Sequence, residues 1–290
     1  MKETEIHPLI ANNRIFLSAG VFDPLSAKLA ERAGFKSVVL SGFAVAATYL
    51  GEPDFGLLTQ SEILDVARRT CRAVDVPVIV DGDTGYGGAL NVTRMVRELL
   101  GMGARGIILE DQTWPKRCGH MRGKSVVPVE EHMQKIRAAK AAKAGEKRPF
   151  FITARTDARG PLGLDEAILR GNAYKEAGAD LIFIEAPQSV AEIERIAKEV
   201  KAPLVINMIE GGKTPILSLE EVHRLGFISC GFVLTGLFAA AKAMADAYAH
   251  LQRFGSSDAM ADQMMSFDEF TDILGLEEKY AFDEKFSWEA

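Results

Sequence analysis

Two carboxylates and a thiol lie close together near the middle of the chain. Glu110 and Asp111 follow a short apolar run, and Cys118 comes a few residues later in the sequence Lys116-Arg117-Cys118-Gly119-His120. Nearby positive charge favours the thiolate over the thiol, so this pattern predicts a cysteine that exchanges a proton near neutral pH. The carboxylates and the ionisable thiol together predict one reaction centre.

A second group of carboxylates follows another apolar run. Asp81 and Asp83 are separated by one glycine, and Glu110 ends the next apolar run along the chain. Such an oxygen-rich cluster suits Mg²⁺ or Mn²⁺, and Asp54 is a fourth candidate ligand. The alternative is a simple turn, since Asp and Gly are common turn formers. We favour the metal site because clustered, unpaired carboxylates repel one another.

Two further side chains fit a site for an anionic substrate. Arg155 ends an apolar run and can hold a carboxylate through two parallel hydrogen bonds, although an ion pair with Asp157 or Glu185 is the alternative. His120 is a candidate base or substrate donor, or it packs the loop. The remaining histidines and the other two cysteines are expected to be structural; they are His7, His132, His223, His250, Cys71 and Cys230.

The segment from Lys116 to Lys124 is cationic and contains Gly119 and Gly123. Two glycines in a charged loop suggest a segment that can move. A lid that carries its own acid would exclude water and complete the site in the same motion. A static surface loop is the alternative, which the concentration of charge disfavours.

These residues must be positioned by a regular scaffold. Eight apolar runs alternate with amphipathic helical patterns, as expected for parallel strands buried on both faces. The expected strands are Ile15–Ser18, Ser37–Ser41, Val76–Asp81, Gly106–Glu110, Phe150–Arg155, Leu181–Glu185, Leu204–Asn207 and Phe227–Leu234. The pattern predicts an α/β fold, a single (β/α)₈ barrel of the TIM type.

A doubly wound open sheet is the competing architecture. There, only strands near the switch point should carry polar groups at their ends. Here such groups end six strands, which favours a closed ring; they are Ser41, Asp81, Asp83, Glu110, Arg155, Glu185 and Asn207.

The end of the chain differs from the rest. We expect a catalytic barrel over residues 1–254 and a C-terminal helical tail over residues 255–290. Phe282, Phe286 and Trp288 stand in an otherwise charged segment, and exposed aromatic side chains suggest docking on the barrel or on a neighbouring subunit.

Composition narrows the function. The 290 residues carry a net charge of −6 with a pI of about 5.5, which argues against a nucleic-acid binder. Three widely spaced cysteines argue against a disulfide framework and for a reducing compartment. Neither a signal-peptide pattern nor a membrane-spanning apolar run stands out, so we expect a cytoplasmic protein without membrane or nucleic-acid partners.

Taken together, the motifs resemble the isocitrate lyase/phosphoenolpyruvate mutase superfamily. The resemblance covers nearly the whole chain, to at least Thr235. The matching segments are Gly20-Val21-Phe22-Asp23-Pro24-Leu25-Ser26-Ala27, Asp81-Gly82-Asp83-Thr84-Gly85-Tyr86-Gly87, Glu110-Asp111-Gln112, Lys116-Arg117-Cys118-Gly119-His120 and Asn207-Met208-Ile209-Glu210-Gly211-Gly212-Lys213-Thr214-Pro215.

The resemblance implies a (β/α)₈ barrel whose last helix is often swapped between subunits of a homodimer or homotetramer. It implies Mg²⁺ or Mn²⁺ held directly or through water by Asp81, Asp83 and Glu110, with Asp54 nearby. Glu185 would lie close to the reacting centre, and Cys118 would be the acid/base on a gating loop. The residues implied to contact the substrate are Ser41, Gly42, Phe43, Gly119, His120, Arg155 and Asn207.

Relatives with this cysteine are mostly carbon–carbon lyases, so the resemblance implies retro-aldol cleavage of a small diacid. The substrate would be a 2-hydroxy dicarboxylate of the 2-alkylmalate type, or hydrated oxaloacetate. The products would be a 2-oxo acid or oxalate, and an enolate that Cys118 protonates. The alternatives are phosphoryl transfer of the carboxyphosphonoenolpyruvate phosphonomutase type and 2-methylisocitrate cleavage; an oxaloacetate decarboxylase and a non-catalytic barrel are less favoured.

Three departures bear on the subfamily. Glu210-Gly211-Gly212 replaces the Glu-Phe-Gly of isocitrate and methylisocitrate lyases, and Met121-Arg122-Gly123-Lys124 replaces the Arg-Pro-Asn form of methylisocitrate lyases. Both point away from a tricarboxylate and toward the group of dimethylmalate lyase, the petal death protein with its oxaloacetate hydrolase activity, and carboxyphosphonoenolpyruvate phosphonomutase. Many relatives have proline where this chain has Val233, so the pocket wall at the eighth strand differs.

Overall fold

A computed structural model of the chain describes residues 7–288, and among these eight parallel strands form a closed barrel. Each strand pairs with the next in chain order, and β1 pairs with both β2 and β8. The prediction of a (β/α)₈ barrel is therefore confirmed. The strands are β1 (Phe16–Val21), β2 (Val38–Leu40), β3 (Val78–Asp81), β4 (Gly106–Glu110), β5 (Phe151–Thr156), β6 (Leu181–Ile184), β7 (Leu204–Met208) and β8 (Ser229–Phe232).

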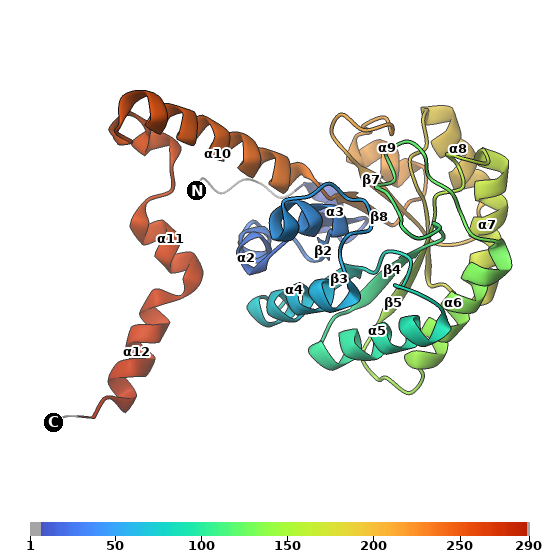
Figure 1. Ribbon diagram of the computed structural model, residues 1–290, viewed down its shortest axis with the longest axis horizontal. Helices are drawn as coiled ribbons and strands as arrows, with labels where there is room; N and C mark the ends of the chain where they lie inside the picture. The colour runs from blue at the N-terminus through green and yellow to red at the C-terminus, as the bar shows by residue number, and fades with distance from the viewer. Residues whose placement is uncertain (1–6, 289–290) are drawn as a thin grey trace. The chain divides into compact units, whose positions relative to one another are not determined.

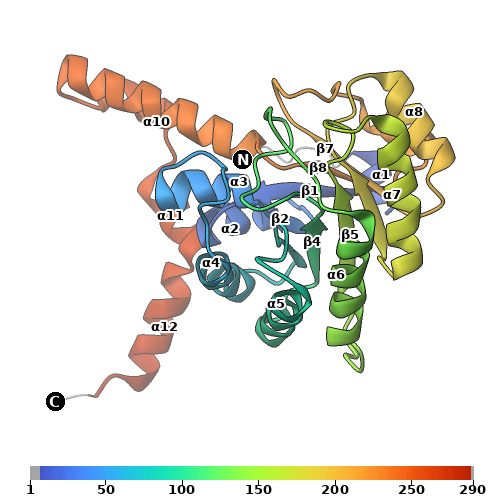
Figure 2. The ribbon, with the colours of Figure 1, turned by 45° about the vertical axis from the view of Figure 1, so that its right-hand side comes forward.

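Helices follow the strands and surround them (Figures 1 and 2). They are α1 (Pro8–Ala11), α2 (Pro24–Arg32), α3 (Gly42–Val45), the π-helical turn η1 (Ala46–Leu50), α4 (Gln60–Ala73), α5 (Ala89–Met102), α6 (Val129–Ala142), α7 (Leu164–Ala177), α8 (Val190–Glu199) and α9 (Leu219–Arg224). Local chemistry sets several boundaries. Thr59 and Glu62 form a capping box at the start of α4, and Gly178 ends α7 in the left-handed conformation.

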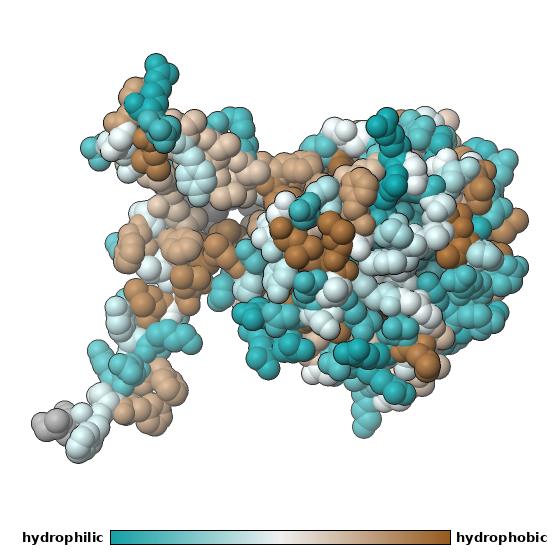
Figure 3. Space-filling view, viewed as in Figure 1, coloured by the Kyte–Doolittle hydropathy of each residue, from teal (hydrophilic) through white to brown (hydrophobic). Residues whose placement is uncertain are grey.

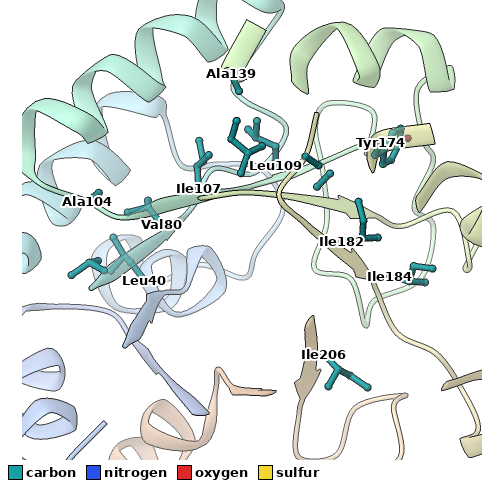
Figure 4. Packing of buried hydrophobic residues seen from close by; sticks show 14 of the residues in the cluster. Leu40, Val80, Ala104, Ile107, Leu109, Ala139, Tyr174, Ile182, Ile184 and Ile206 are labelled. Atoms are coloured by element: carbon teal, nitrogen blue, oxygen red, sulfur yellow. The ribbon is translucent and has the colours of Figure 1, made fainter. Parts of the chain in front are cut away.

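The main hydrophobic core lies between the strands and the surrounding helices. The side chains of Ile107, Leu109 and Ile182 are fully buried there, together with Ala139 of α6 and Tyr174 of α7 (Figure 4). Because both faces of each strand are covered, the strands are apolar along most of their length. Burial at every strand fixes the register that brings polar side chains to the strand ends.

The polar strand-end residues gather at one end of the barrel. Glu110 ends β4 and lies opposite Arg155 of β5 in the strand register. Asp81 ends β3, and Glu185 comes directly after β6. In a (β/α)₈ barrel the carboxyl ends of all strands meet at one face, which is where such enzymes build their sites.

The chain divides into two compact units, one formed by the described residues up to Leu237 and one that begins at Phe238. The second unit contains most of α10 (Thr235–Phe254), the 3₁₀ turn η2 (Asp258–Gln263), α11 (Phe267–Leu274) and α12 (Leu276–Phe286). We expected a boundary at residue 254, with α10 in the barrel. The compact division comes earlier because no residue of α10 is buried after Leu237.

Apolar side chains lie along the surface of the second unit (Figure 3). The exposed aromatic residues there include Tyr248, Phe254, Phe267, Tyr280, Phe282, Phe286 and Trp288. None of the described helices is both long enough and apolar enough to cross a membrane.

Candidate active site

Four carboxylates converge on one lysine at the carboxyl end of the barrel. Lys116 Nζ lies 2.8 Å from Asp54 Oδ2 and 2.6 Å from Asp83 Oδ1. Asp81 Oδ2 accepts a hydrogen bond of 3.2 Å from the amide of Gly42. Although burial opposes the charge on Lys116, the surrounding carboxylates, Asp83 first, raise its pKa well above the usual value. Carboxylates that were expected to lie together thus surround Lys116, a neighbour that the sequence did not reveal.

The carboxylate oxygens of this cluster suit a divalent cation. Glu110 Oε1 is buried without a hydrogen-bond partner among the described residues. Removal from water is the largest cause that raises the pKa of Asp81 to about 6, with Asp83 next, and burial likewise raises the pKa of Asp54 and of Glu110. Oxygen ligands with excess negative charge are the set that Mg²⁺ or Mn²⁺ takes.

These carboxylates do not stand as a ready-made ligand set. No three of the described His, Cys, Asp and Glu side chains are grouped closely enough to hold a metal ion as they lie. The ammonium group of Lys116 pairs with Asp54 and Asp83. It therefore supplies positive charge at the place where these carboxylate oxygens would otherwise bind a metal cation. The residues fit a divalent ion, and Lys116 competes for the same oxygens.

Cys118 does not lose its proton near neutral pH, contrary to the expectation from its basic neighbours in the sequence. The side chain is 9% exposed, and burial raises the pKa of its thiol to about 11, while Asp54 and Glu185 act in the same direction. The basic neighbours do not offset this. Lys116 is paired with carboxylates, and the Arg117 guanidinium lies over the Phe55 ring, 5.3 Å from its centroid. Cys118 is therefore a neutral thiol at pH 7, which makes it a proton donor.

Asp111 is also not part of the reaction centre. Its carboxylate accepts hydrogen bonds from Thr156 Oγ1 at 2.7 Å, Tyr174 OH at 2.7 Å and Arg170 Nη1 at 3.0 Å, all behind the strand ends. It also accepts from the amide of Asp157 at 2.9 Å. Asp111 thus anchors β5 and α7, and only Glu110 of the two adjacent carboxylates faces the site.

Arg155 pairs with three carboxylates at once. Its Nε lies 2.8 Å from Asp157 Oδ2, its Nη1 3.2 Å from Glu185 Oε2 and its Nη2 3.3 Å from Glu110 Oε2. Both internal ion pairs named as the alternative therefore form. Although burial opposes ionisation, Arg155 and His120 lower the pKa of Glu185, so this carboxylate is charged at neutral pH.

His120 bridges two loops of the site. Its Nδ1 accepts a 2.8 Å hydrogen bond from the amide of Lys213, which leaves the ring proton on Nε2 in the neutral tautomer. Nε2 lies 2.9 Å from Glu185 Oε1. His120 therefore holds the 116–124 loop against both Glu185 and the segment that follows β7.

The 116–124 loop lies closed over the site. A side chain at Gly119 would collide with Glu185, since a Cβ there would lie 2.3 Å from Glu185 Cγ. Lys124 Nζ donates to the carbonyl of Gly119 and lies 2.7 Å from Asp157 Oδ1. Lys124 and Asp157 were not among the predicted site residues. The signal was present in the sequence, as lysines at both ends of a glycine-containing loop.

One pocket brings together most of the predicted site residues. Those lining it are Ser41, Phe43, Asp54, Asp81, Cys118, Gly119, His120, Arg155, Glu185 and Asn207. Gly42, Asp83 and Glu110 lie next to it through the contacts given above. The hydroxyl of Ser41 accepts from the amide of Ala44 at the start of α3, and Asn207 packs against Gly231. All the predicted residues thus meet at this end of the barrel.

The pocket is small and has an apolar side. Its free volume is about 40 Å³, room for only a few water molecules. The apolar wall consists of Val39, Phe43, Ile108, Phe183, Ile209, Val233 and Leu234. The closed 116–124 loop contributes Cys118, Gly119 and His120 to the lining of this pocket.

Comparisons with known proteins agree with this arrangement. Residues 6–252 match the phosphoenolpyruvate phosphomutase family. The chain is 48% identical to the petal death protein of Dianthus caryophyllus over 98% of its own length and 89% of that protein. It is 43% identical to carboxyvinyl-carboxyphosphonate phosphorylmutase of Arabidopsis thaliana (98% and 85% covered) and 42% identical to 2,3-dimethylmalate lyase of Eubacterium barkeri (94% and 94%).

Solved structures are similar as well. Oxaloacetate acetylhydrolase in complex with 3,3-difluorooxalacetate superposes with a TM-score of 0.90 at 32% identity, covering 97% of this chain and 96% of that one. Phosphonopyruvate hydrolase in complex with oxalate and Mg²⁺ gives a TM-score of 0.85 at 33% identity, with 96% of each chain covered. The chain belongs to the phosphoenolpyruvate phosphomutase family and is an enzyme of the isocitrate lyase/phosphoenolpyruvate mutase superfamily, which includes carbon–carbon lyases.

Proposed function

We propose that the enzyme cleaves a carbon–carbon bond in a 2-hydroxy dicarboxylate of the 2-alkylmalate type, or in hydrated oxaloacetate. The observation that carries this proposal is the neutral thiol of Cys118, held in the same pocket as Arg155 and next to the carboxylate cluster. Retro-aldol cleavage leaves an enolate, which needs a proton donor beside it. A thiol with a pKa of about 11 stays protonated until that carbanion forms.

Substrate binding would use the fixed charge of Arg155 and the residues that surround it in the pocket. Arg155 is positioned by Asp157 and can offer a guanidinium edge to a substrate carboxylate. Ser41, Gly42 and Phe43 at the start of α3, and the side chain of Asn207, would also contact the substrate. His120 would contact the substrate from the loop.

Asp81, Asp83, Glu110 and Asp54 would hold Mg²⁺ or Mn²⁺. Such a cation, when bound, acts as a Lewis acid that lowers the pKa of a coordinated hydroxyl group. The relative described above in complex with oxalate and Mg²⁺ supports this choice of cation.

Two side chains of the protein, Glu185 and Cys118, would transfer the protons. The ionised Glu185 accepts the proton of the C2 hydroxyl, and the C2–C3 electron pair leaves with C3. C2 becomes the carbonyl carbon of a 2-oxo acid, or of oxalate when the substrate is hydrated oxaloacetate. Cys118 then gives its proton to C3, which completes the second carboxylic acid.

The pocket favours a dicarboxylate over a tricarboxylate. Among the described residues that line it, Arg155 is the only arginine or lysine, and it already faces Glu185. A third substrate carboxylate would have no fixed cation of its own. The apolar wall of Phe43, Ile209, Val233 and Leu234 instead suits hydrogen or a small alkyl group on C3.

A second candidate is phosphoryl transfer of the phosphonomutase type. The 43% identity to carboxyvinyl-carboxyphosphonate phosphorylmutase supports it. Cleavage of 2-methylisocitrate is a third, which the shortage of cations in the pocket disfavours.

A substrate panel separates these reactions. The enzyme would be incubated with Mg²⁺ and, in turn, oxaloacetate, 2-alkylmalates, 2-methylisocitrate and phosphonopyruvate, and the products read by NMR. We expect oxalate and acetate, or a 2-oxo acid and a second carboxylic acid. Turnover of the phosphonate with no cleavage of any malate or of oxaloacetate would overturn the proposal.

A further inference from the structure

A second cavity opens at the opposite end of the barrel from the active site. It is lined by residues at the amino ends of the strands, among them Phe16 of β1, Phe151 of β5 and Leu181 of β6. Its volume is about 420 Å³. The middle of a (β/α)₈ barrel is normally a packed core made of layers of inward side chains. A cavity of this size inside the barrel differs from that usual packing and has room for a bound molecule.

Small side chains at inward positions create this space. Ser18 of β1, Thr153 of β5 and Gly231 of β8 all line the cavity, where bulky branched residues are usual. Ser18 Oγ is hydrogen-bonded to Ser37 Oγ at 2.8 Å, so these hydroxyl groups satisfy each other and leave the space apolar. Most of the remaining wall is apolar, including Val39, Ile79, Ile108, Phe183, Val205 and Ile206.

The cavity is separate from the active-site pocket. Val39, Ile108, Phe183 and Asn207 line both spaces, so their side chains form the partition between them. A molecule in the second cavity would contact this partition from the side away from Cys118. Binding there therefore needs none of the catalytic groups.

The mouth of the cavity is positively charged. Lys36 is exposed just before β2, and Arg105 is half-exposed just before β4. Neither forms an ion pair or side-chain hydrogen bond with another of the described residues, and no Asp or Glu is among the described residues that line the cavity. Two cations that have no partner within residues 7–288, at the rim of an apolar cavity, complement a molecule with an anionic head and an apolar chain.

We infer that this cavity binds a medium-chain fatty carboxylate, with the chain inside the barrel and the carboxylate between Lys36 and Arg105. The volume lies in the range of small-molecule sites. An apolar cavity of this kind gains little from water and takes an apolar guest readily.

The test uses straight-chain carboxylates at submicellar concentrations, titrated calorimetrically into the purified full-length enzyme. Affinity should rise from hexanoate to octanoate to decanoate by roughly fourfold per added methylene. 1-Decanol should bind more weakly than decanoate. The double variant Lys36→Glu/Arg105→Glu should lose decanoate affinity by at least roughly tenfold and keep its affinity for 1-decanol.

Controls make either result informative. Arg94→Glu reverses an exposed charge outside the cavity lining and should leave decanoate binding unchanged. Val205→Phe fills part of the cavity and should weaken decanoate and 1-decanol alike. Because both mouth residues are at the surface, the double variant should fold, and its unfolding temperature without ligand checks this. Absent decanoate binding, no chain-length dependence, or equal binding to the double variant would each overturn the inference.

Discussion

At the scale of single residues, burial decides the chemistry of the site. Cys118 has basic neighbours in the sequence, yet its pKa rises to about 11 because the thiol is buried beside Asp54 and Glu185. Desolvation disfavours a charged thiolate more than distant or already paired cations can favour it. The same residue is thus poised to donate a proton rather than to attack as a nucleophile.

Cys118→Ser should retain the fold while cleavage falls by about 10²- to 10⁴-fold, the usual contribution of a positioned general acid. A serine hydroxyl is a far weaker acid than a thiol, so protonation of the enolate becomes slow. Steady-state kinetics on the substrate found in the panel would measure the loss. Cys71→Ser, which changes a half-buried cysteine of α4, is the matched control and should keep full activity. If Cys118→Ser turned over substrate at a rate close to that of the wild type, Cys118 would not be the general acid.

If the carboxylate cluster binds a divalent cation as proposed, its affinity should depend on pH. The pKa of Asp81 is raised to about 6, so this group is protonated below that pH and ionised above it. A metal ligand must be deprotonated, and the affinity for Mg²⁺ or Mn²⁺ should therefore fall as the pH drops through 6. Mn²⁺ titrations followed by electron paramagnetic resonance on either side of this pH would measure it. Asp81→Asn should bind weakly at both pH values, and a wild-type affinity that does not change with pH would contradict the prediction.

The residue identities at the site could be predicted from sequence, whereas their states could not. Asp81, Glu110, Arg155 and Glu185 lie at or directly after the carboxyl ends of their strands and therefore had to meet at one face. The protonation of Cys118 depends on burial and on Asp54, which is 64 positions earlier in the chain. Such long-range pairings carry no local signal.

At the scale of elements, the strands fix the floor of the site and one loop closes it. Every predicted strand overlaps an observed one because continuous apolar runs mark strands buried on both faces. The closed position of the 116–124 loop was not predictable, since it depends on contacts with distant elements. Lys116 reaches Asp54 before α4, and Lys124 reaches Asp157 after β5.

Lys124→Met should favour the open loop. The variant keeps the aliphatic stem but removes the ammonium group that bridges the Gly119 carbonyl and Asp157. Hydrogen bonds to charged groups contribute about 1.5–3 kcal/mol, so catalytic efficiency should fall by roughly 10- to 100-fold. Kinetics would measure this loss, and hydrogen–deuterium exchange over residues 116–124 should become faster.

Lys147→Met is the control for this variant, because Lys147 is exposed in the α6–β5 connection, outside the loop. It should leave both exchange and kinetics unchanged. If residues 116–124 of Lys124→Met exchange deuterium as slowly as in the wild type and the variant retains its activity, other contacts hold the loop closed. Lys124 would then not be the residue that closes it.

At the scale of the whole molecule, the barrel and the C-terminal unit differ in what they bury. The barrel has a continuous core, whereas α10 has no buried residue after Leu237, and α12 has none at all among those described. Phe282 and Phe286 are each 66% exposed in α12. Large exposed apolar surface on a folded protein usually marks an interface. We propose that this unit joins copies of the chain into a homodimer or homotetramer.

Phe282→Asp/Phe286→Asp should weaken that association. Burying a phenylalanine contributes about 1.5–3 kcal/mol, so losing two per chain lowers the association constant by roughly 100-fold or more. Sedimentation velocity should show the variant shifting to smaller species as it is diluted, while its far-ultraviolet circular dichroism stays that of the wild type. Lys279→Asp changes a charge on the same helix without removing apolar surface and should sediment as the wild type does. Because the barrel carries its own core, dissociation need not unfold it; a wild-type protein that sediments as a monomer at every concentration would exclude the assembly.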